Sequence, residues 1–396
     1  MNSKTKTTAT KEEAKPALVP TLRFPEFRGA QGWKQTPLEV CLDYQQPTPY
    51  LVADTTYSPA FKTPVLTAGK TFILGYTDEQ HGIFSEGLPV IIFDDFTTAS
   101  QFVDFPFKAK SSAMKILEAK NGADIKFMYE TLQTISYEVG VHGRHWISNF
   151  APMLVPVPTP AEQQKIAECL SSVDELIAAQ ARKLDALKTH KKGLMQQLFP
   201  REGETQPRLR FPEFQNAGEW VEATLGAACR MQAGKFVSAS DIREKNAEGL
   251  FPCYGGNGLR GYTATFTHSG KYPLIGRQGA LCGNVKLGLG QFHATEHAVV
   301  VTPKNDVAVD WLFYLLDFLN LNQYATGQAQ PGLSVDVLEK VPVSIPNQAA
   351  EQQRIADCLS SLDDLIAAQT QTLEALKTHK QGLMQQLFPS PEAASA

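Results

Sequence analysis

Residues 161–170 read Ala-Glu-Gln-Gln-Lys-Ile-Ala-Glu-Cys-Leu, and residues 350–359 read Ala-Glu-Gln-Gln-Arg-Ile-Ala-Asp-Cys-Leu. Both phrases run on to the same ending, Gly-Leu-Met-Gln-Gln-Leu-Phe-Pro, at 193–200 and 382–389. A shorter phrase, Leu-Arg-Phe-Pro-Glu-Phe, stands at 22–27 and again at 209–214, each time with a Trp six residues later. The segments between these phrases share almost no wording. A chain that repeats its connectors and varies its globular parts presents two different surfaces on one pseudo-symmetric frame.

The long phrase places apolar residues at alternating steps of four and three, which predicts a coiled-coil helix in each copy. In the first copy Thr159 is expected to cap the helix, Pro160 to take its first position and Glu162 to close a capping box. The prolines at 200 and 389 predict the ends, so each helix should run about 38 residues. The seam positions are Ile166, Leu170, Val173, Ile177, Gln180, Leu184, Leu187, Lys191, Leu194 and Leu198, and Ile355, Leu359, Leu362, Ile366, Gln369, Leu373, Leu376, Lys380, Leu383 and Leu387.

The two lysines in the seam indicate the direction in which the helices pair. A parallel pair would place Lys191 beside Lys380, two ammonium groups where solvent is scarce. An antiparallel pair is expected to set each lysine opposite an apolar residue, so that its head can reach water. We therefore predict an antiparallel coiled coil. Two unrelated amphipathic helices, each packed on its own domain, are the alternative.

The segments between the repeats indicate two globular domains of mixed α/β type. Each contains a proline-led apolar run followed by a polar turn, at 88–93 and 272–276, which predicts that the two domains share a fold. Further strands are expected at 126–129 and 298–302, and a helix at 310–319. The fold class is α+β: two mixed α/β domains joined by two long helices in an antiparallel, pseudo-two-fold coiled coil. The predicted parts are a disordered tail (1–17), the first domain with its leading segment (18–157), the first helix (158–200), the second domain with its leading segment (201–345), the second helix (346–390) and a tail (391–396).

Composition and charge place the chain among ordinary globular proteins. Hydrophobic residues make up 43% and charged residues 20% of 396 residues, values typical of soluble domains. The polar start of the chain lacks a signal peptide, and no apolar run reaches the ~20 residues of a membrane span. The six cysteines show no metal-ligand spacing, so we expect reduced thiols in a cytoplasmic protein. The net charge is −4, which by itself disfavours nucleic-acid binding.

Searches for catalytic motifs return nothing that fits an enzyme. The chain has no P-loop and no methyltransferase motif of the Asn-Pro-Pro-Tyr type. Residues 256–261 match G-x-G-x-x-G, but a strand-like stretch follows where a dinucleotide site needs a helix. His142, His145, His293 and His297 pair with no evident nucleophile and are interpreted as surface or hydrogen-bonded histidines. We expect a non-enzymatic protein without a cofactor or a metal.

The repeated phrases together resemble the specificity (S) subunits of type I restriction-modification systems. The resemblance rests on Leu-Arg-Phe-Pro-Glu-Phe followed by Trp, on the Ala-Glu-Gln-Gln phrases and helix endings, and on the loops at 92–98 and 275–280. It covers about residues 18 to 390, and the order of the parts matches as well. It implies two target recognition domains, each reading half of a bipartite double-stranded DNA target, with paired helices as the ruler. It also implies no catalysis by the subunit itself, and assembly with two methyltransferase subunits and with motor-nuclease subunits.

Base-edge readout needs few side chains, chiefly Arg or Lys on guanine and Asn or Gln on adenine. Arg277 and Gln278, on a turn between glycines, are expected to read the second half-site. The loop 94–100 and the segment 108–112 are expected to serve the first, with Asp94 or Asp95 accepting from a cytosine or only bracing the loop. A coiled-coil scaffold with two protein-binding domains is the alternative function. The predicted DNA-binding residues are Asp94, Asp95, Thr97, Thr98, Lys108, Lys110, Ser111, Arg144, Lys235, Arg260, Arg277, Gln278 and His293.

Overall fold

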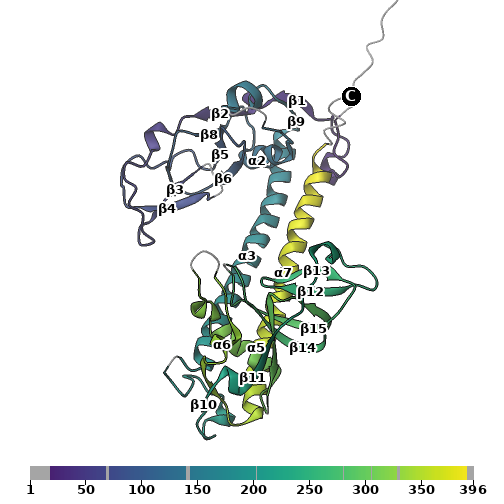
Figure 1. The fold of residues 1–396 in the computed structure, drawn as a ribbon. Helices are drawn as coiled ribbons and strands as arrows, with labels where there is room; N and C mark the ends of the chain where they lie inside the picture. Colours follow the sequence, from purple (N-terminus) through teal and green to yellow (C-terminus); the bar gives the residue numbers. More distant parts are fainter. Residues whose placement is uncertain are drawn as a thin grey trace, which may run out of the picture. The chain divides into compact units, whose positions relative to one another are not determined.

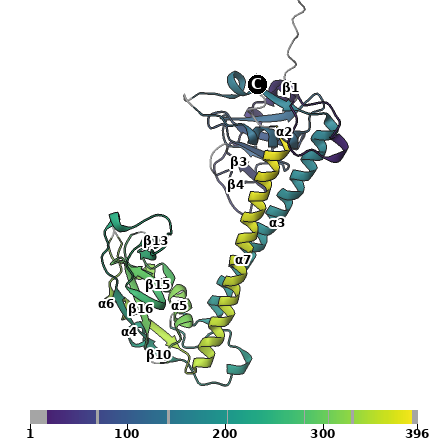
Figure 2. The same cartoon turned by 90° about the vertical axis from the view of Figure 1, so that its right-hand side faces the viewer.

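The computed structural model describes residues 18–67, 71–139, 143–201, 203–279, 281–304, 306–327 and 331–389. The chain divides into two compact units (Figures 1 and 2). The first unit holds the residues up to Gln180 and those from Thr372 onward, and the second holds Ala181–Gln371. Each unit therefore contains one globular domain, the first half of one long helix and the second half of the other.

The first unit contains a four-stranded sheet in the order β2-β8-β5-β6, a three-stranded sheet in the order β4-β3-β7 and the ribbon β1–β9. Strand β5 is buried along its whole length, between antiparallel partners β6 and β8. The elements are η1 (Pro25–Phe27), β1 (Lys34–Pro37), α1 (Leu38–Cys41), β2 (Leu42–Gln45), η2 (Thr48–Tyr50), β3 (Thr63–Leu66), β4 (Ile73–Thr77), β5 (Val90–Asp94), β6 (Ser100–Val103), β7 (Lys108–Ala109), β8 (Met114–Ala119), α2 (Ile125–Thr134), η3 (Trp146–Phe150), β9 (Leu154–Val157) and α3 (Pro160–Leu198).

The second unit is built on a six-stranded sheet in the order β11-β16-β14-β15-β12-β13, with β10–β17 as a separate ribbon. Its strands are antiparallel except for β12 and β15, which run parallel. The elements are η4 (Pro212–Phe214), β10 (Val221–Thr224), α4 (Leu225–Ala228), β11 (Cys229–Ala233), η5 (Ala239–Asp241), β12 (Phe251–Gly255), β13 (Gly258–Thr263), β14 (His268–Gly276), β15 (Val285–Ala294), β16 (Ala298–Pro303), α5 (Val309–Phe318), η6 (Leu321–Tyr324), α6 (Val335–Leu338), β17 (Pro342–Ile345) and α7 (Ala349–Leu387).

The two domains begin alike and then diverge. In each, a short strand (β1 or β10), a one-turn helix (α1 or α4) and a second strand (β2 or β11) follow one another without a gap. Beyond this point the first domain divides its strands between two sheets, whereas the second gathers them into one. The β-α-β start that the domains share comes directly after the repeated phrase. The sheets that differ are formed by the segments that are not repeated.

One predicted strand is wrong. Residues 126–129 lie in helix α2 (Ile125–Thr134), and not in a strand. The Asp124 side chain caps this helix by accepting a hydrogen bond from the backbone N–H of Phe127, at 2.8 Å, which is ordinary N-cap chemistry. A four-residue apolar run does not distinguish a strand from one turn of a buried helix. The helix predicted at 310–319 is confirmed as α5.

The helices α3 and α7 lie antiparallel in each unit, as the seam predicted (Figures 1 and 2). The ammonium groups of the seam lysines are paired with carboxylates, however, and do not simply reach out into water. Lys380 forms an ion pair with Asp174 at 2.7 Å in the first unit, and Lys191 forms one with Asp363 at 2.6 Å in the second. Both aspartates directly follow a seam residue, so each lysine is neutralised across the helix pair. The expectation that the lysines reach out past apolar residues is therefore corrected.

Each of these cross-helix ion pairs also contacts a helix of the globular domain in its unit. In the first unit, Lys380 and Lys126 both contact the fully buried carboxylate of Glu130 on α2. Burial would raise the pKa of Asp174, but hydrogen bonds from Lys126 and Lys380 outweigh it and keep that pKa below its ordinary value. In the second unit, the Tyr314 hydroxyl on α5 donates to Asp363 at 2.8 Å.

The two repeated phrases meet in each unit through the same contacts. Arg23 donates two hydrogen bonds of 2.7 Å to the buried carboxylate of Glu162, and Trp33 Nε1 donates to it at 3.3 Å. Glu162 is therefore not the closing member of a capping box, as the sequence had suggested. A fork-to-fork pair of this kind is specific in direction as well as strong.

The second copy repeats this anchor residue by residue. Arg210 donates at 2.6 and 2.7 Å to Glu351, and Trp220 Nε1 donates at 3.2 Å. The following glutamines are equivalent too: Gln163 accepts from the backbone N–H of Asp124, and Gln352 accepts from that of Ala308. The repeated wording therefore encodes one device, which fixes the start of a long helix to the domain that precedes it.

Candidate nucleic-acid interface

Three loops of the second unit meet backbone to backbone at glycines. A Cβ at Gly276 would lie 1.8 Å from the carbonyl oxygen of Gly256, and a Cβ at Gly234 would lie 2.1 Å from that of Ala294. No side chain fits at either position, so the loops after β11, β12 and β14 are closely packed against one another and against the end of β15. We call this cluster, residues 234–236, 256–257, 276–278 and 294–297, the loop base.

Backbone hydrogen bonds fix the loop base. The N–H of Lys235 donates to Ala294 O at 2.8 Å, and that of Arg277 donates to His297 O at 3.0 Å. The carbonyl of Arg277 accepts in turn from Leu333 N at 2.9 Å. The side chains of these loops therefore project from a backbone that is already held in place, as specific recognition requires.

The loop base presents polar side chains, several without an internal partner. Lys235 and Gln278 are exposed, and Arg260, just past the loop base on β13, is exposed as well. Three buried polar atoms here have no hydrogen-bond partner among the residues that the structure describes: Arg277 Nε, Glu296 Oε2 and His297 Nδ1. Buried polar atoms are rarely left unpaired in folded proteins, so this group suits an external partner with donors and acceptors of its own.

His293 does not belong to the exposed surface. It is buried, and both ring nitrogens are within hydrogen-bond distance of protein atoms: Nδ1 lies 3.0 Å from Thr265 Oγ1 and Nε2 lies 3.0 Å from Lys235 O. The contact between its Nε2 and the Lys235 carbonyl helps to hold the Lys235 loop in place. The geometry argues against the predicted DNA contact by His293 and supports a positioning role.

The nearby His268 is half-buried and packs on an aromatic ring. Its ring stacks on Phe292, with centroids 5.5 Å apart. Burial lowers the pKa of His268, and the neighbouring His293 and Lys235 lower it further. The ring is therefore neutral near pH 7 and acts as an aromatic packing group.

In the first unit, the loop after β5 is braced by its aspartates. Asp94 accepts from the N–H of Phe96 at 2.9 Å and from the Thr97 hydroxyl at 2.7 Å. Asp95 accepts from the N–H groups of His145 and Trp146, at 3.0 and 2.8 Å. Both carboxylates are buried. The burial argues against contact with a cytosine and supports the bracing role that the sequence also allowed.

Lys108 is likewise used inside the protein. It is 3% exposed, forms an ion pair with Glu79 at 2.8 Å and donates to His81 O at 2.6 Å. Desolvated in this way, its ammonium group is not available to a phosphate. The position of Lys108 therefore argues against the predicted DNA contact by this residue.

The remaining predicted residues of the first unit lie at the surface. Thr97, Ser111 and Arg144 are exposed, and Thr98 and Lys110 are half-buried. Thr98 has φ = 62°, a left-handed conformation that is uncommon outside glycine. The backbone hydrogen bond from Asp95 N to Ala113 O, at 3.1 Å, holds the Thr97 loop beside the segment that contains Ser111. His142, one of the histidines considered above, lies outside the described residues.

Sequence reasoning missed Asn257 and Glu296, which share the loop base with the predicted residues. Both stand next to a residue that packs tightly, and the only signal in the sequence is the density of glycines at 255–261 and 276–283. The glycine density at 256–261 predicts a turn-rich loop; this is wrong for 258–261, which belong to strand β13, and only 256–257 form a turn. It did not show that separate turns converge.

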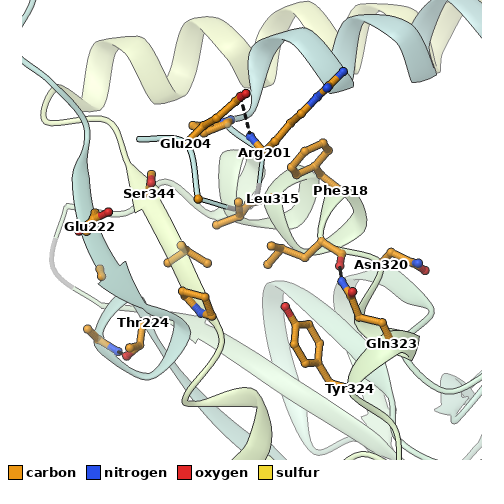
Figure 3. A pocket seen from close by; sticks show the side chains of 17 residues that line it. Arg201, Glu204, Glu222, Thr224, Leu315, Phe318, Asn320, Gln323, Tyr324 and Ser344 are labelled. Atoms are coloured by element: carbon orange, nitrogen blue, oxygen red, sulfur yellow. Dashed lines mark hydrogen bonds between the residues drawn. The ribbon is translucent and has the colours of Figure 1, made fainter. Parts of the chain in front are cut away.

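A cavity of about 840 Å³ lies elsewhere in the second unit (Figure 3). It is lined by Leu315, Phe318 and Tyr324 on one side and by Glu222, Thr224 and Ser344 of the ribbon β10–β17 on the other (Figure 3). Arg201 and Glu204 close one side through a backbone-to-carboxylate hydrogen bond of 3.4 Å. Its lining shares no residue with the loop base.

The described part of the chain contains no group of three or more His, Cys, Asp or Glu side chains placed to hold a metal ion. All six cysteines, which lie within that part, are free thiols. Burial raises the pKa of the Cys229 thiol to about 12. No helix among the described residues is long and apolar enough to cross a membrane.

Comparison with known proteins agrees with this arrangement. Residues 217–378 match the family described as "Type I restriction modification DNA specificity domain". The EcoR124I/EcoR124II specificity subunit of Escherichia coli is 30% identical over 390 residues, which cover 91% of this chain and 95% of that subunit. The EcoprrI specificity subunit of Escherichia coli is 46% identical over 158 residues, which cover 40% of this chain and 39% of that subunit.

Solved structures show the same fold. The S subunit of a type I restriction-modification system from M. genitalium superposes with a TM-score of 0.66 at 18% identity, over 94% of this chain and 99% of that one. Two β-rich domains and two long helices in antiparallel contact define the fold class that the chain shares with that structure. The chain belongs to the specificity subunits of type I restriction-modification systems. Such a subunit is the non-catalytic DNA-specificity component of a type I complex.

Proposed function

We propose that each globular domain reads one half of a bipartite double-stranded DNA target, and that the helix pair sets the distance between the halves. The observation that carries this proposal is the repeated anchor, Arg23 and Trp33 on Glu162 and Arg210 and Trp220 on Glu351. The same device mounts two domains whose strands are arranged in different sheets. Identical mounts with different surfaces suit two different half-sites.

In the second domain, Arg277, Gln278 and Arg260 approach base edges in the major groove, where Arg pairs with guanine and Gln with adenine. Lys235 contacts a phosphate and so sets the register without reading sequence. His293 positions the Lys235 loop through the contact between its ring and the Lys235 carbonyl.

In the first domain, Arg144 and Lys110 contact phosphates or guanines, and the hydroxyls of Thr97, Thr98 and Ser111 complete the surface. These residues are exposed or half-buried, unlike the bracing group behind them. The bracing residues are Asp94, Asp95 and Lys108.

We further propose that the helix pair docks two methyltransferase subunits, and that motor-nuclease subunits join for cleavage in the cytoplasm. A net charge of −4 provides little attraction for DNA over a long footprint. Partner subunits therefore supply much of the phosphate contact, and this chain supplies the base readout.

Exchange of segment 37–155 for that of a related specificity subunit tests the assignment. The altered chain, co-expressed with its methyltransferase subunits, should methylate a target in which one half-site has changed and the other has not. The matched control exchanges 224–345 and should change the opposite half. Sequencing of methylated host DNA reads out both. If either exchange altered both halves together, one domain would not correspond to one half-site.

A further inference from the structure

Phe236 is an apolar side chain held in solvent by a rigid backbone. It is 75% exposed, the highest value among the large apolar side chains of the described residues. The residue before it, Lys235, is fixed by hydrogen bonds from its N–H to Ala294 O, at 2.8 Å, and between its carbonyl and the His293 ring, at 3.0 Å. The residue after it, Val237, is buried at 9% exposure. The ring therefore stands out between two anchored neighbours.

The position of Phe236 is continuous with the candidate reading surface. Gly234 packs on the backbone of Ala294 and Thr295. The segment 294–297 also contacts Arg277, because Arg277 N donates a hydrogen bond to His297 O. The exposed ring is thus carried by the same packed group of loops as the polar side chains of Lys235, Arg277 and Gln278. Exposed apolar surface bordered by polar groups marks an interaction site.

Duplex DNA offers one apolar group in the major groove, the C5-methyl of thymine, and a phenylalanine is among the side chains that contact it. Arg277 and Gln278 make their base pairings in the same groove. We propose that Phe236 reads a thymine methyl group in the second half-site and so determines specificity at that base pair. This inference rests on the proposed function of the second domain. It adds an apolar readout to the polar contacts.

The test replaces the methyl group, one position at a time. The duplex is the methylation-mapped target with each thymine of the second half-site changed in turn to deoxyuridine, which lacks only the C5-methyl. The protein is the full chain in complex with its methyltransferase. At one position, deoxyuridine should weaken binding about fourfold, the value of one buried methyl group. In Phe236→Ala the same replacement should make no difference, and Phe236→Leu should keep a preference for thymine.

The control variant is Leu289→Ala, which removes a side chain of 57% exposure on β15 outside the loop base and should respond to deoxyuridine as the natural protein does. Three results would overturn the proposal: a second half-site without an A·T pair, a Phe236→Ala complex that still senses the methyl group, or a Phe236→Ala chain that fails to assemble with the methyltransferase. The last would make Phe236 a protein contact. If the domain exchange still moves the second half-site, the proposed function stands while this inference falls.

Discussion

At the scale of single residues, the structure separates side chains that brace from side chains that reach outward. The predicted contact residues were chosen for their chemistry alone, and chemistry does not reveal burial. Asp94, Asp95, Lys108 and His293 have the right functional groups but use them internally. Arg260 and Gln278 have the same kind of groups on the surface. The difference lies in which loops pack against which strands, and no single-sequence pattern gives that.

Arg277→Ala should relax recognition at one base pair of the second half-site. The Arg277 side chain is half-buried, and its Nε has no hydrogen-bond partner among the described residues, so we expect the guanidinium to make a bidentate contact with guanine. Loss of such a contact costs roughly 1–3 kcal/mol of discrimination. Binding of the methyltransferase complex to the target and to its single-base variants measures the effect. The control is Arg230→Ala, an exposed arginine at the other end of β11, which should leave discrimination unchanged. Full discrimination by Arg277→Ala would remove Arg277 from the reading surface.

At the scale of secondary structure, the long helices were the most predictable elements. A 4-3 spacing that continues for four heptads predicts both the helix and its seam, and the structure places α3 at Pro160–Leu198 and α7 at Ala349–Leu387. The short elements were harder. The four residues 126–129, one lysine and three apolar residues, fit either a strand or a helix. The cap at Asp124 and the packing of α2 determine that they form a helix. The partners of the seam lysines could not be predicted either, because they depend on the register in which α3 and α7 pair.

Lys380→Met should destabilise the first unit. The substitution leaves the fully buried Glu130 with Lys126 as its remaining ion-pair partner. Because one cation stays in place, we expect a loss of roughly 1–3 kcal/mol and not the full cost of an isolated buried charge. Chemical denaturation of the full chain, with hydrogen exchange on α2 to locate the effect, measures it.

The control for this substitution is three residues away on the same helix. Lys377 pairs with Glu374 at the surface, where the two side chains are 49% and 63% exposed. Lys377→Met should change stability by less than about 0.5 kcal/mol. Equal effects of the two substitutions would mean that the Lys380 cluster is no more than a surface ion pair.

At the scale of the whole molecule, repetition is the informative property. The anchor of Arg, Trp and Glu occurs twice, whereas each globular domain has a sequence of its own. The sequence alone therefore predicted two domains with different surfaces on a repeated frame. The device works only because the phrases 22–33 and 161–164 fold against each other, and 209–220 against 350–353. Distant parts of the sequence are thus coupled within each unit. The amino-acid sequence contains no comparable repeat that would indicate which DNA bases each domain is proposed to read.

Lengthening the helix pair should lengthen the gap between the half-sites. We would insert one heptad after Leu184 in α3 and one after Leu373 in α7, equivalent positions that keep the pairs Lys380–Asp174 and Lys191–Asp363 in register. Seven residues add ~10 Å at 1.5 Å per residue, or up to about three base pairs of B-DNA. Three base pairs also turn the groove by about a third of a turn, so methylation should be weaker as well as shifted. Sequencing of DNA methylated by the mutant complex gives the new gap. An active mutant with the original gap would show that these helices do not set the spacing, and the two half-sites would then be held apart by some other part of the complex.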